Sequence, residues 1–279
     1  MKRKLALILL LCFSLTLVLA GCSSQAPEEP GEDTQTPAVE DTSWQDIQDK
    51  GHFVVGLDDA FPPMGFREKG TNDIVGFDID LAKEVAQRMG VEVQFQPVIW
   101  DTIIEELNGG NVDVIWNGLT ITEERKAKIA FTKPYIEDKQ IIVVQKGSPI
   151  ANKKDLAGKT IGIQNASSAV KAVKAEPEIY ESFKDMVEFT SNDEALLDLS
   201  AGRLDAVVVD EVVGKWYISK KPDTYQILED NFGKEQFGVG VRQTDKAFLQ
   251  ELDKALDAMK ADGTAAEISQ KWFGENITI

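Results

Sequence analysis

The chain has 279 residues, a formal net charge of −17, a single histidine and two cysteines. This excess of acidic side chains argues against nucleic acid and anionic membrane surfaces as partners, because both are negatively charged. With His52 as its one histidine, the sequence offers no Ser-His-Asp or Cys-His catalytic machinery and no histidine–cysteine metal site. No cofactor is expected.

The first residues have the pattern of an export signal. Three basic residues, 2–4, precede an apolar run, 5–20, which is marginal for a bilayer span of about 20 residues and ends in small side chains. Leu19-Ala20-Gly21-Cys22 resembles the lipobox of bacterial lipoproteins. The resemblance implies that residues 1–21 are a signal peptide and that Cys22 carries lipid. A plain signal peptide with a chance cysteine, or an uncleaved anchor, remain alternatives.

Residues 22–42 are expected to form a flexible linker after the lipidated cysteine. Residues 23–41 are rich in Pro, Glu, Ser, Thr and Gln and lack large apolar side chains, so burial would not repay the cost of ordering them. Cys12 would be removed with the signal, which leaves the folded part without a disulfide or thiol chemistry. The remaining length is large for one core and sufficient for two lobes.

Helices and strands alternate at short intervals in the first half of the folded part. Helices are predicted at residues 43–51, 77–89 and 101–107, and strands at 53–57, 91–95 and 112–116. Ser43 is expected to cap the first helix. Short alternation of this kind predicts βαβ units and a mostly parallel sheet.

The second half repeats this plan. Strands are predicted at residues 160–164, 187–189 and 206–209, with helices from about Ser168 and at 193–201. A short internal repeat supports two similarly built lobes. Residues 107–115 align without gaps to residues 199–207, with a leucine, a glycine and an aspartate at matching positions. In both segments the glycine is placed to end a helix and the aspartate to open a buried strand.

The last part of the chain is assigned back to the first lobe. A strand is predicted at residues 237–242 and amphipathic helices at 247–259 and 265–272. The chain would then cross between lobes near residues 141–144 and again near 236–237, and two such crossings make a hinge. The predicted division places residues 43–142 and 237–279 in lobe 1 and residues 143–236 in lobe 2.

Polar residues follow the predicted strands, where ligands gather in open α/β sheets. Arg125 offers a two-pronged donor suited to a carboxylate, and Thr120, Ser167 and Ser168 add hydroxyls near helix starts. Asp210 suits an ammonium group, so together these residues suit an α-amino acid. Each has a plainer alternative: Thr120 or Thr122 as a helix cap, Arg125 paired with Glu124, and Asp210 as a turn cap.

Two aromatic residues stand beside turns rather than in the regular apolar pattern. Phe61 and Trp100 could enclose the aliphatic part of a ligand or cover a cation. The alternative for both is a place in the lobe core.

Several motifs in a fixed order resemble family 3 solute-binding proteins, which serve ABC transporters of polar amino acids such as histidine, glutamine, cystine and lysine/arginine/ornithine. The resemblance covers nearly all of residues 44–273. The motifs are Gly56-Leu57-Asp58 with Phe61-Pro62-Pro63, Gly76-Phe77-Asp78-Ile79-Asp80-Leu81-Ala82, Gly118-Leu119-Thr120-Ile121-Thr122-Glu123-Glu124-Arg125, Phe131-Thr132-Lys133-Pro134-Tyr135 and Gly202-Arg203-Leu204-Asp205-Ala206.

The resemblance implies a type II periplasmic-binding fold, in which two α/β lobes close on a ligand, and it implies roles for individual residues. Arg125 and Thr120, aided by Ser167 and Ser168, would hold the ligand carboxylate. Asp210 and the carbonyl of Gly118 would hold the α-ammonium. Phe61 and Trp100 would flank the side chain, and Asp58 would meet its polar tip.

Two departures from the family pattern affect the expected site. Trp116-Asn117 stands where relatives often have small residues, so Asn117 could touch the ligand side chain. Asn165-Ala166 opens the serine loop where many relatives have glycine at the second position, which leaves the backbone geometry of that loop open.

The expected protein is a monomeric binding lipoprotein outside the cytoplasm, anchored to the membrane by its N-terminal lipid. It would capture a free L-amino acid and deliver it to an ABC transporter permease. Asp58 favours a cationic or amide side chain over an acidic one. The alternatives are a dehydratase of the same fold, in which Asp58 or Glu211 would act as a general acid, and the sensing domain of a receptor kinase.

Overall fold

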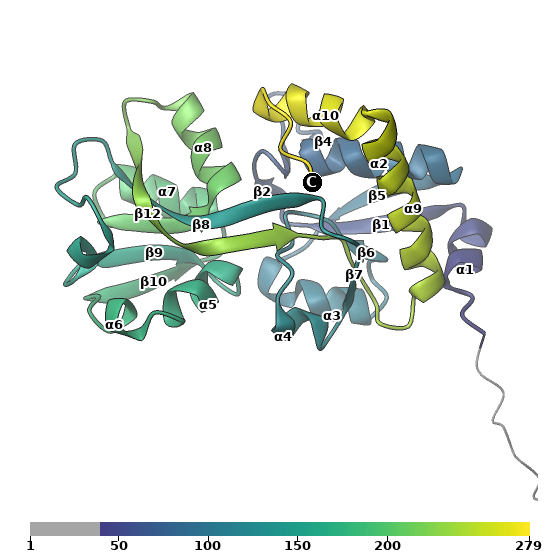
Figure 1. Cartoon of the computed structure of the whole chain (residues 1–279), viewed down its shortest axis with the longest axis horizontal. Helices are drawn as coiled ribbons and strands as arrows, with labels where there is room; N and C mark the ends of the chain where they lie inside the picture. Colours follow the sequence, from purple (N-terminus) through teal and green to yellow (C-terminus); the bar gives the residue numbers. More distant parts are fainter. Residues whose placement is uncertain (1–39) are drawn as a thin grey trace, which may run out of the picture. The chain divides into compact units, whose positions relative to one another are not determined.

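The computed structural model describes residues 40–279 and contains two five-stranded sheets, each with its own helices, and one small three-stranded sheet (Figure 1). We call each large sheet with the helices packed on it a lobe. The predicted signal peptide, Cys22 and nearly all of the predicted linker lie outside the described residues. Among residues 40–279, none of the helices combines the length and apolar character needed to cross a lipid bilayer.

The first lobe is built on a sheet with the strand order β5-β1-β6-β13-β7. Its strands are β1 (His52–Leu57), β5 (Glu92–Pro97), β6 (Val114–Ile115), β7 (Ala130–Phe131) and β13 (Gly240–Val241). β1 runs parallel to β5 and β6, whereas β13 runs antiparallel to β6 and β7. The C-terminal part of the chain therefore returns to the sheet that the first strand began.

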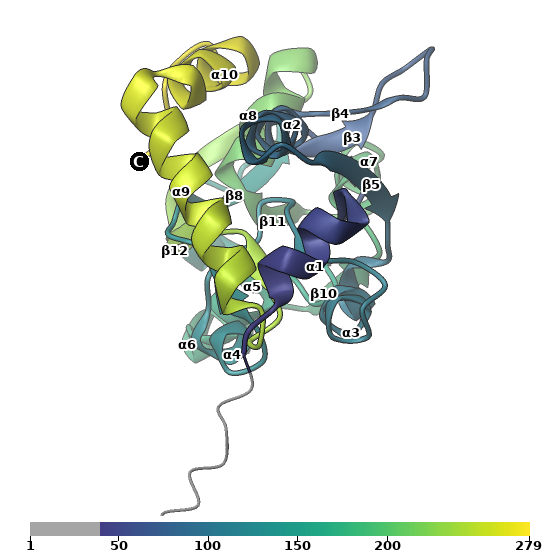
Figure 2. The ribbon, with the colours of Figure 1, turned by 90° about the vertical axis from the view of Figure 1, so that its right-hand side faces the viewer.

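Helices cover both faces of this first sheet. Its helices are α1 (Ser43–Lys50), α2 (Phe77–Met89), a 3-10 turn η1 (Trp100–Thr102), α3 (Ile103–Asn108), α4 (Glu123–Lys126), α9 (Lys246–Asp262) and α10 (Thr264–Phe273). α9 packs against α1, α2 and α10, which lie around it in Figure 2. On the other face, α3 lies over apolar residues that include Val112 and Ile115.

The small sheet lies beside β1 and positions one predicted site residue. It consists of β2 (Ala60–Phe61), β3 (Gly65–Arg67) and β4 (Ile74–Val75) in antiparallel order. Phe61 closes β2 and is buried, because its ring packs into the core of the first lobe.

The second lobe has the strand order β10-β9-β11-β8-β12. Its elements are β8 (Ile136–Gln145), a 3-10 turn η2 (Lys153–Leu156), β9 (Thr160–Gln164), α5 (Ser168–Lys174), α6 (Pro177–Tyr180), β10 (Asp185–Phe189), α7 (Asn192–Ser200), β11 (Ala206–Asp210), α8 (Glu211–Lys220) and β12 (Tyr225–Phe237). β9 is parallel to β10 and β11, and β8 is antiparallel to β11 and β12.

The expectation of mostly parallel sheets is wrong in one respect, because both sheets are mixed. In each sheet half of the strand pairings are antiparallel. The reason is topological. β8 leaves the first lobe and runs away from it, whereas β9 and β11 end facing the first lobe, so β8 must oppose them. β8 and β12 pair from Ile136 with Phe237 to Gln145 with Tyr225, and they run side by side in Figure 1.

Most predicted elements are present with similar bounds. The helix at residues 77–89 and the strand at 160–164 have their predicted bounds. The strand predicted at 237–242 is instead two pieces, because β12 ends at Phe237 in the second sheet and β13 begins at Gly240 in the first. Ser43 does not cap α1: Thr42 holds the N-cap position, and the Ser43 hydroxyl accepts a hydrogen bond from the Phe248 amide. The predicted division of the chain between the lobes stays a prediction.

Candidate functional site

The carboxyl ends of the central strands of the two sheets face each other. Asp58 follows β1 and Asn117 follows β6 in the first lobe, whereas Gln164 ends β9 and Asp210 ends β11 in the second. Hydrogen bonds already join the two lobes at this junction. Gln164 Nε2 donates to Asp58 Oδ2 at 2.8 Å, and the hydroxyls of Thr120 and Ser168 lie 3.0 Å apart.

Thr120 and Ser168 both reach a residue that the sequence analysis did not single out. The Thr120 hydroxyl donates to Glu235 Oε1 at 3.0 Å, and the Ser168 hydroxyl lies 3.4 Å from the same oxygen. Gln140 Nε2 donates to it at 2.7 Å. Glu235 is half-buried on β12, next to the point where this strand leaves the second lobe. One acidic residue on a strand of mixed exposure gives no sequence signal of such a position.

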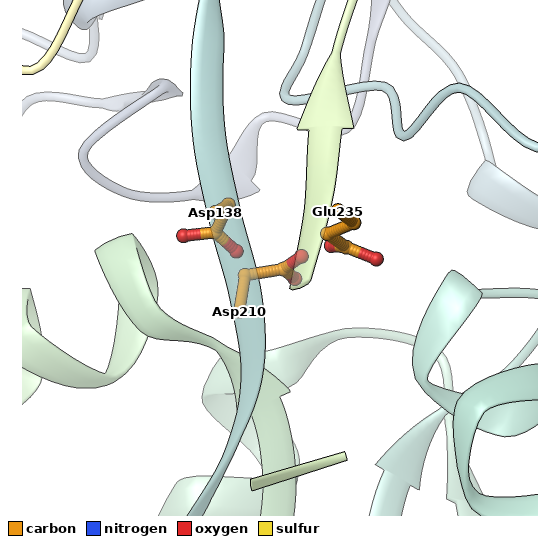
Figure 3. Close-up of side chains that lie close together, drawn as sticks. All are labelled: Asp138, Asp210 and Glu235. Atoms are coloured by element: carbon orange, nitrogen blue, oxygen red, sulfur yellow. The ribbon is translucent and has the colours of Figure 1, made fainter. Parts of the chain in front are cut away.

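Asp210 belongs to a cluster of three carboxyl groups. Asp138 on β8, Asp210 at the end of β11 and Glu235 on β12 each place a carboxylate oxygen within 4.8 Å of the others, and Figure 3 shows their side chains close together. Burial, with the charges of Glu235 and Asp138, raises the pKa of Asp210 well above its usual value. Burial and the charge of Glu235 also raise the pKa of Asp138, although backbone amides of α8 donate to it.

Arg125 lies at the boundary between the lobes. Its Nη1 donates to the Thr120 carbonyl at 2.9 Å and its Nη2 to the Ala166 carbonyl at 3.4 Å, while its Cζ lies 5.6 Å from the centre of the Trp100 ring. Burial lowers the pKa of the Arg125 guanidinium, and the negative charges of Glu235 and Asp210 oppose that shift. The guanidinium is therefore close enough to the acidic cluster to interact with it through charge.

The structure decides between the simpler capping and pairing roles that the sequence left open for Thr120, Thr122 and Arg125. Thr122 caps α4, because its hydroxyl accepts from the Arg125 amide at 3.1 Å, and Thr120 does not. Glu124 pairs with Lys128 rather than with Arg125. Ser167 holds the N-cap position of α5, but its hydroxyl donates back to the Gln164 carbonyl at 2.8 Å. Of the two predicted serines, only Ser168 directs its hydroxyl to Thr120.

Asp58 and Asn117 form a buried pair at the edge of the first sheet. Asn117 Oδ1 accepts from the Asp58 amide at 3.0 Å, and Asp58 Oδ1 accepts from the Ala60 amide at 2.9 Å. The Nδ2 atom of Asn117 is buried without a hydrogen-bond partner among the described residues. Burial raises the pKa of the Asp58 carboxyl, while the hydrogen bonds from Ala60 and Gln164 lower it. Gln164 is a second residue that the sequence analysis missed.

Gly118 has a backbone conformation and surroundings that favour glycine. Its φ is +59°, and a Cβ atom there would lie 2.8 Å from Cε1 of Phe61. Its amide donates to Asp78 Oδ2 at 2.7 Å, and the Tyr135 hydroxyl donates to the same oxygen at 3.0 Å. Complete burial raises the pKa of Asp78 to about 7. Asp78 and Tyr135 therefore hold the loop that carries Asn117 and Gly118.

A cavity of about 450 Å³ opens beside Arg125, between the helices α3, α4 and α5. Trp100, Arg125, Ser167 and Ser168 line it, whereas Asp58, Phe61 and Asp210 do not. Trp100 also packs in the core beneath α3, so its core alternative holds in part. The rings of Trp100 and Phe61 form no aromatic pair among the described residues, and their enclosure of a ligand stays a prediction.

Comparison with known proteins identifies the family. Residues 53–275 match the family model of the bacterial extracellular solute-binding proteins, family 3. The chain belongs to this family. The resemblance drawn from the sequence motifs is thereby confirmed, and so is the type II binding-protein fold.

Curated relatives in the family are named as amino acid-binding proteins. The L-cystine-binding protein TcyJ of Escherichia coli is 29% identical over 83% of this chain and 86% of its own length. The glutamine-binding protein GlnH of an ABC transporter of Bacillus subtilis is 30% identical over 99% of both chains. These relatives are binding proteins rather than enzymes.

Solved structures of family members agree in fold. A substrate-binding protein of an ABC uptake transporter from Streptococcus pneumoniae, with bound histidine, has a TM-score of 0.81 at 36% identity and covers 85% of this chain and 98% of its own. An ancestral arginine-binding protein bound to arginine has a TM-score of 0.75 at 41% identity, over 80% and 99%. Both neighbours bind an amino acid, and the first is the substrate-binding protein of an ABC uptake transporter.

Proposed function

We propose that this chain binds one polar L-amino acid between its two lobes and delivers it to the permease of an ABC importer. The observation that carries the proposal is the pairing of opposite chemistries at the interlobe junction. Arg125 with the hydroxyls of Thr120 and Ser168 offers donors to a carboxylate, and Asp210 offers an acceptor to an ammonium. An α-amino acid carries both groups on one carbon.

In this proposal each site residue has one role. Arg125, Thr120 and Ser168 bind the α-carboxylate, and Ser167 contributes through its place at the N-terminus of α5. Asp210 and the Gly118 carbonyl bind the α-ammonium. The side chain of the ligand lies among the remaining predicted residues, which are Asp58, Phe61, Trp100 and Asn117.

Closure of the lobes about β8 and β12 completes the site. These two strands are the paired connections between the sheets, and the hydrogen bonds from Gln164 to Asp58 and between Thr120 and Ser168 span the lobes. A ligand that adds further contacts to both lobes favours their closed arrangement over the open one. The closed form is then the form that the permease recognises.

We further propose that Cys22 is lipidated after export and that the protein works as a monomer at the outer surface of the cell membrane. The lipobox, the export signal and the linker support this anchoring. The family is extracellular by its description, which agrees with this location.

A thermal-shift screen of the twenty standard amino acids plus cystine and ornithine tests the proposal. Binding to the folded state alone raises the unfolding temperature, by an amount that grows with ligand concentration relative to Kd. We expect a saturable shift with one or a few polar amino acids. No shift with any compound at millimolar concentration would contradict the proposed function.

A dehydratase remains the second candidate, because burial raises the pKa of the Asp58 carboxyl, which suits a general acid. A structural neighbour is described as an ancestral amino acid-binding protein that preceded cyclohexadienyl dehydratase, with a TM-score of 0.76 at 34% identity. Incubation with prephenate and arogenate distinguishes the two functions. Turnover that depends on Asp58 or Glu211 would favour the enzyme.

A further inference from the structure

Three aromatic side chains from the two lobes meet outside the set of proposed ligand contacts. Trp216 lies on α8 of the second lobe, whereas Phe66 lies on β3 of the small sheet and Trp272 on α10 of the first lobe. The ring centre of Trp216 lies 5.5 Å from that of Phe66 and 6.4 Å from that of Trp272, which are distances of direct ring contact. We call these three residues the aromatic cluster. Because its rings come from both lobes, separation of the lobes would break it.

The first-lobe part of the aromatic cluster is held in place by its own contacts. The ring centres of Phe66 and Trp272 lie 5.9 Å apart with an angle of 86° between the planes, which is an edge-to-face arrangement. Trp272 Nε1 donates to Asp80 Oδ2 on α2 at 2.7 Å, and Lys271 Nζ pairs with the same oxygen at 2.6 Å. None of these contacts involves the second lobe. Phe66 and Trp272 therefore offer Trp216 a preformed surface, which lowers the entropy lost on contact.

The aromatic cluster joins the lobes on a different side from the polar contact of Thr120 with Ser168. Figure 1 shows α8 and α10 on one side of the connecting strands β8 and β12, and α4 and α5 on the other; Figure 2 shows the same separation. Thr120 precedes α4 and Ser168 begins α5, with their hydroxyls 3.0 Å apart. The lobes are thus held together on both sides of β8 and β12.

We propose that the aromatic cluster stabilises the closed arrangement of the lobes, and so raises the affinity for each amino acid that the protein binds, without touching the ligand. The inference rests on the proposed function, because it needs a ligand that binds between closing lobes. None of the three residues is among the proposed ligand contacts, and none lines the cavity beside Arg125. A contact made only in the closed form favours that form, and the apparent affinity rises with the population of the form that binds.

Two consequences distinguish this role from that of a ligand contact. Loss of a cluster residue weakens the binding of different amino acids by the same factor, because each of them needs the same closed form. Loss of a ligand contact instead changes the ratio of their affinities. The effects of Phe66 and Trp216 also depend on each other, because each ring loses its partner when the other is removed.

Isothermal titration calorimetry with the full-length protein tests the inference. The probes are the two of L-arginine, L-histidine, L-glutamine and L-cystine that give the largest thermal shifts. Each aromatic pair of Trp216 is worth roughly a two- to tenfold change in an equilibrium constant. We therefore expect Trp216→Ala to raise the Kd of both probes by the same factor, about five- to a hundredfold. Trp216→Phe, which keeps an aromatic ring, should restore most of the affinity.

Trp44→Ala is the matched control. Trp44 on α1 is also a half-buried tryptophan, and its ring stacks on that of Phe248 on α9 with the ring centres 6.3 Å apart. Both helices belong to the first lobe, so this variant loses an aromatic contact that does not span the lobes. Its Kd for both probes should stay close to that of wild type.

Phe66→Ala and Trp216→Ala, measured singly and together, test the contact itself. If the two rings act through each other, the double variant binds more tightly than the product of the single effects predicts, because the second substitution removes a contact that is already lost. Independent effects of the two substitutions would show that the rings do not act as one cluster, and would overturn the inference.

Binding by Trp216→Ala that is as tight as in wild type, or tighter, would also overturn the inference, since the aromatic cluster would then not favour the closed form. Unequal factors for the two probes would do the same, because they would place Trp216 against the ligand side chain. Failure of every probe to bind wild type would instead count against the proposed function. If Trp216→Ala does not fold, Phe66→Ala, which removes the same contact from the first lobe, takes its place.

Discussion

Gln164, the last residue of β9, donates a 2.8 Å hydrogen bond to Asp58, which follows β1 in the other sheet. The amide of Gln164 is itself fixed, since Asn192 Nδ2 donates to its oxygen at 2.9 Å and the Thr190 carbonyl accepts from its nitrogen at 3.1 Å. Asp58 is thus held by a rigid partner on the opposite lobe. The side-chain part of the proposed site is closed by a polar contact rather than by the aromatic pair alone.

Replacing Arg125 tests the carboxylate site. Hydrogen bonds to charged groups contribute roughly 1.5–3 kcal/mol each, so Arg125→Ala should weaken amino acid binding by about ten- to a hundredfold or more. The loss has two sources, the missing donors and a ligand carboxylate left unpaired between the lobes. Isothermal titration calorimetry measures the change in Kd.

Arg203→Ala is the control for this substitution. Arg203 is an exposed arginine that pairs with Asp198 on the surface of the second lobe, away from the junction. Its loss should leave the Kd within a factor of two. Near-normal affinity of Arg125→Ala would remove Arg125 from the binding site.

Asp78 predicts a pH dependence of stability that can be separated from ligand binding. Its folded-state pKa of about 7 lies above the usual value of 3.8, so the folded state holds a proton that the unfolded state loses between these values. The contribution of Asp78 to stability is full below pH 3.8 and is lost as pH rises toward 7, by up to about 1.4 kcal/mol per pH unit.

Asp78→Asn removes this titration while keeping an oxygen for the Gly118 amide and the Tyr135 hydroxyl. The stability of the variant relative to wild type should therefore rise steadily between pH 5 and pH 7. Urea unfolding at several pH values gives both curves. A constant difference over this range would mean that Asp78 does not titrate there in the folded protein.

How much of this site the sequence could predict depends on the kind of contact. The location of Asp58, Asn117 and Asp210 could be predicted, because the ends of parallel strands share one edge of a sheet and these residues stand at such ends. The location of Glu235 and Gln140 could not, because they lie within the strands β12 and β8, and their meeting depends on the pairing of those strands. The antiparallel pairings of β8 in the second sheet and of β13 in the first make both sheets mixed, and local patterns do not reveal these pairings.

The direction in which a side chain points was the second feature that the sequence could not predict. Ser167 and Ser168 are neighbours at a helix start with the same chemistry, yet only Ser168 turns to Thr120. The sequence indicated that Trp100 lies beside a turn. It did not indicate that the ring packs both beneath α3 and against Arg125. These choices are set by packing between the lobes, which no single segment encodes.

Replacing Cys22 tests the anchor. Cys22→Ser should release the protein from the membrane fraction, because a serine cannot carry the thioether-linked lipid. Fractionation of cells that produce wild type and variant, followed by immunoblotting, measures this release. Cys12→Ser, which leaves Cys22 intact, is the control, and this variant should remain with the membrane. Retention of Cys22→Ser in the membrane fraction would contradict the lipoprotein assignment.

The last prediction concerns which side chains the site accepts. Asp58 is 9% exposed, and its oxygens accept hydrogen bonds from Ala60 and Gln164. A carboxylate here attracts a guanidinium or ammonium and accepts from an amide, but it repels a second carboxylate, at a cost that grows once water leaves the site. Arginine, lysine, histidine, glutamine or cystine should therefore bind at least tenfold more tightly than glutamate near neutral pH.

Asp58→Asn separates this effect from the contacts with the α-carboxylate. The variant keeps an oxygen for the Ala60 amide and loses the charge, so the gap between cationic ligands and glutamate should narrow, while the contribution of Arg125 to binding stays as in wild type. Competition titrations with a bound reference amino acid measure both affinities in each protein. If glutamate wins in wild type, Asp58 does not face the ligand side chain. If a neutral aliphatic amino acid wins, Phe61 and Trp100 set selectivity instead, because apolar contact then outweighs the attraction of the carboxylate.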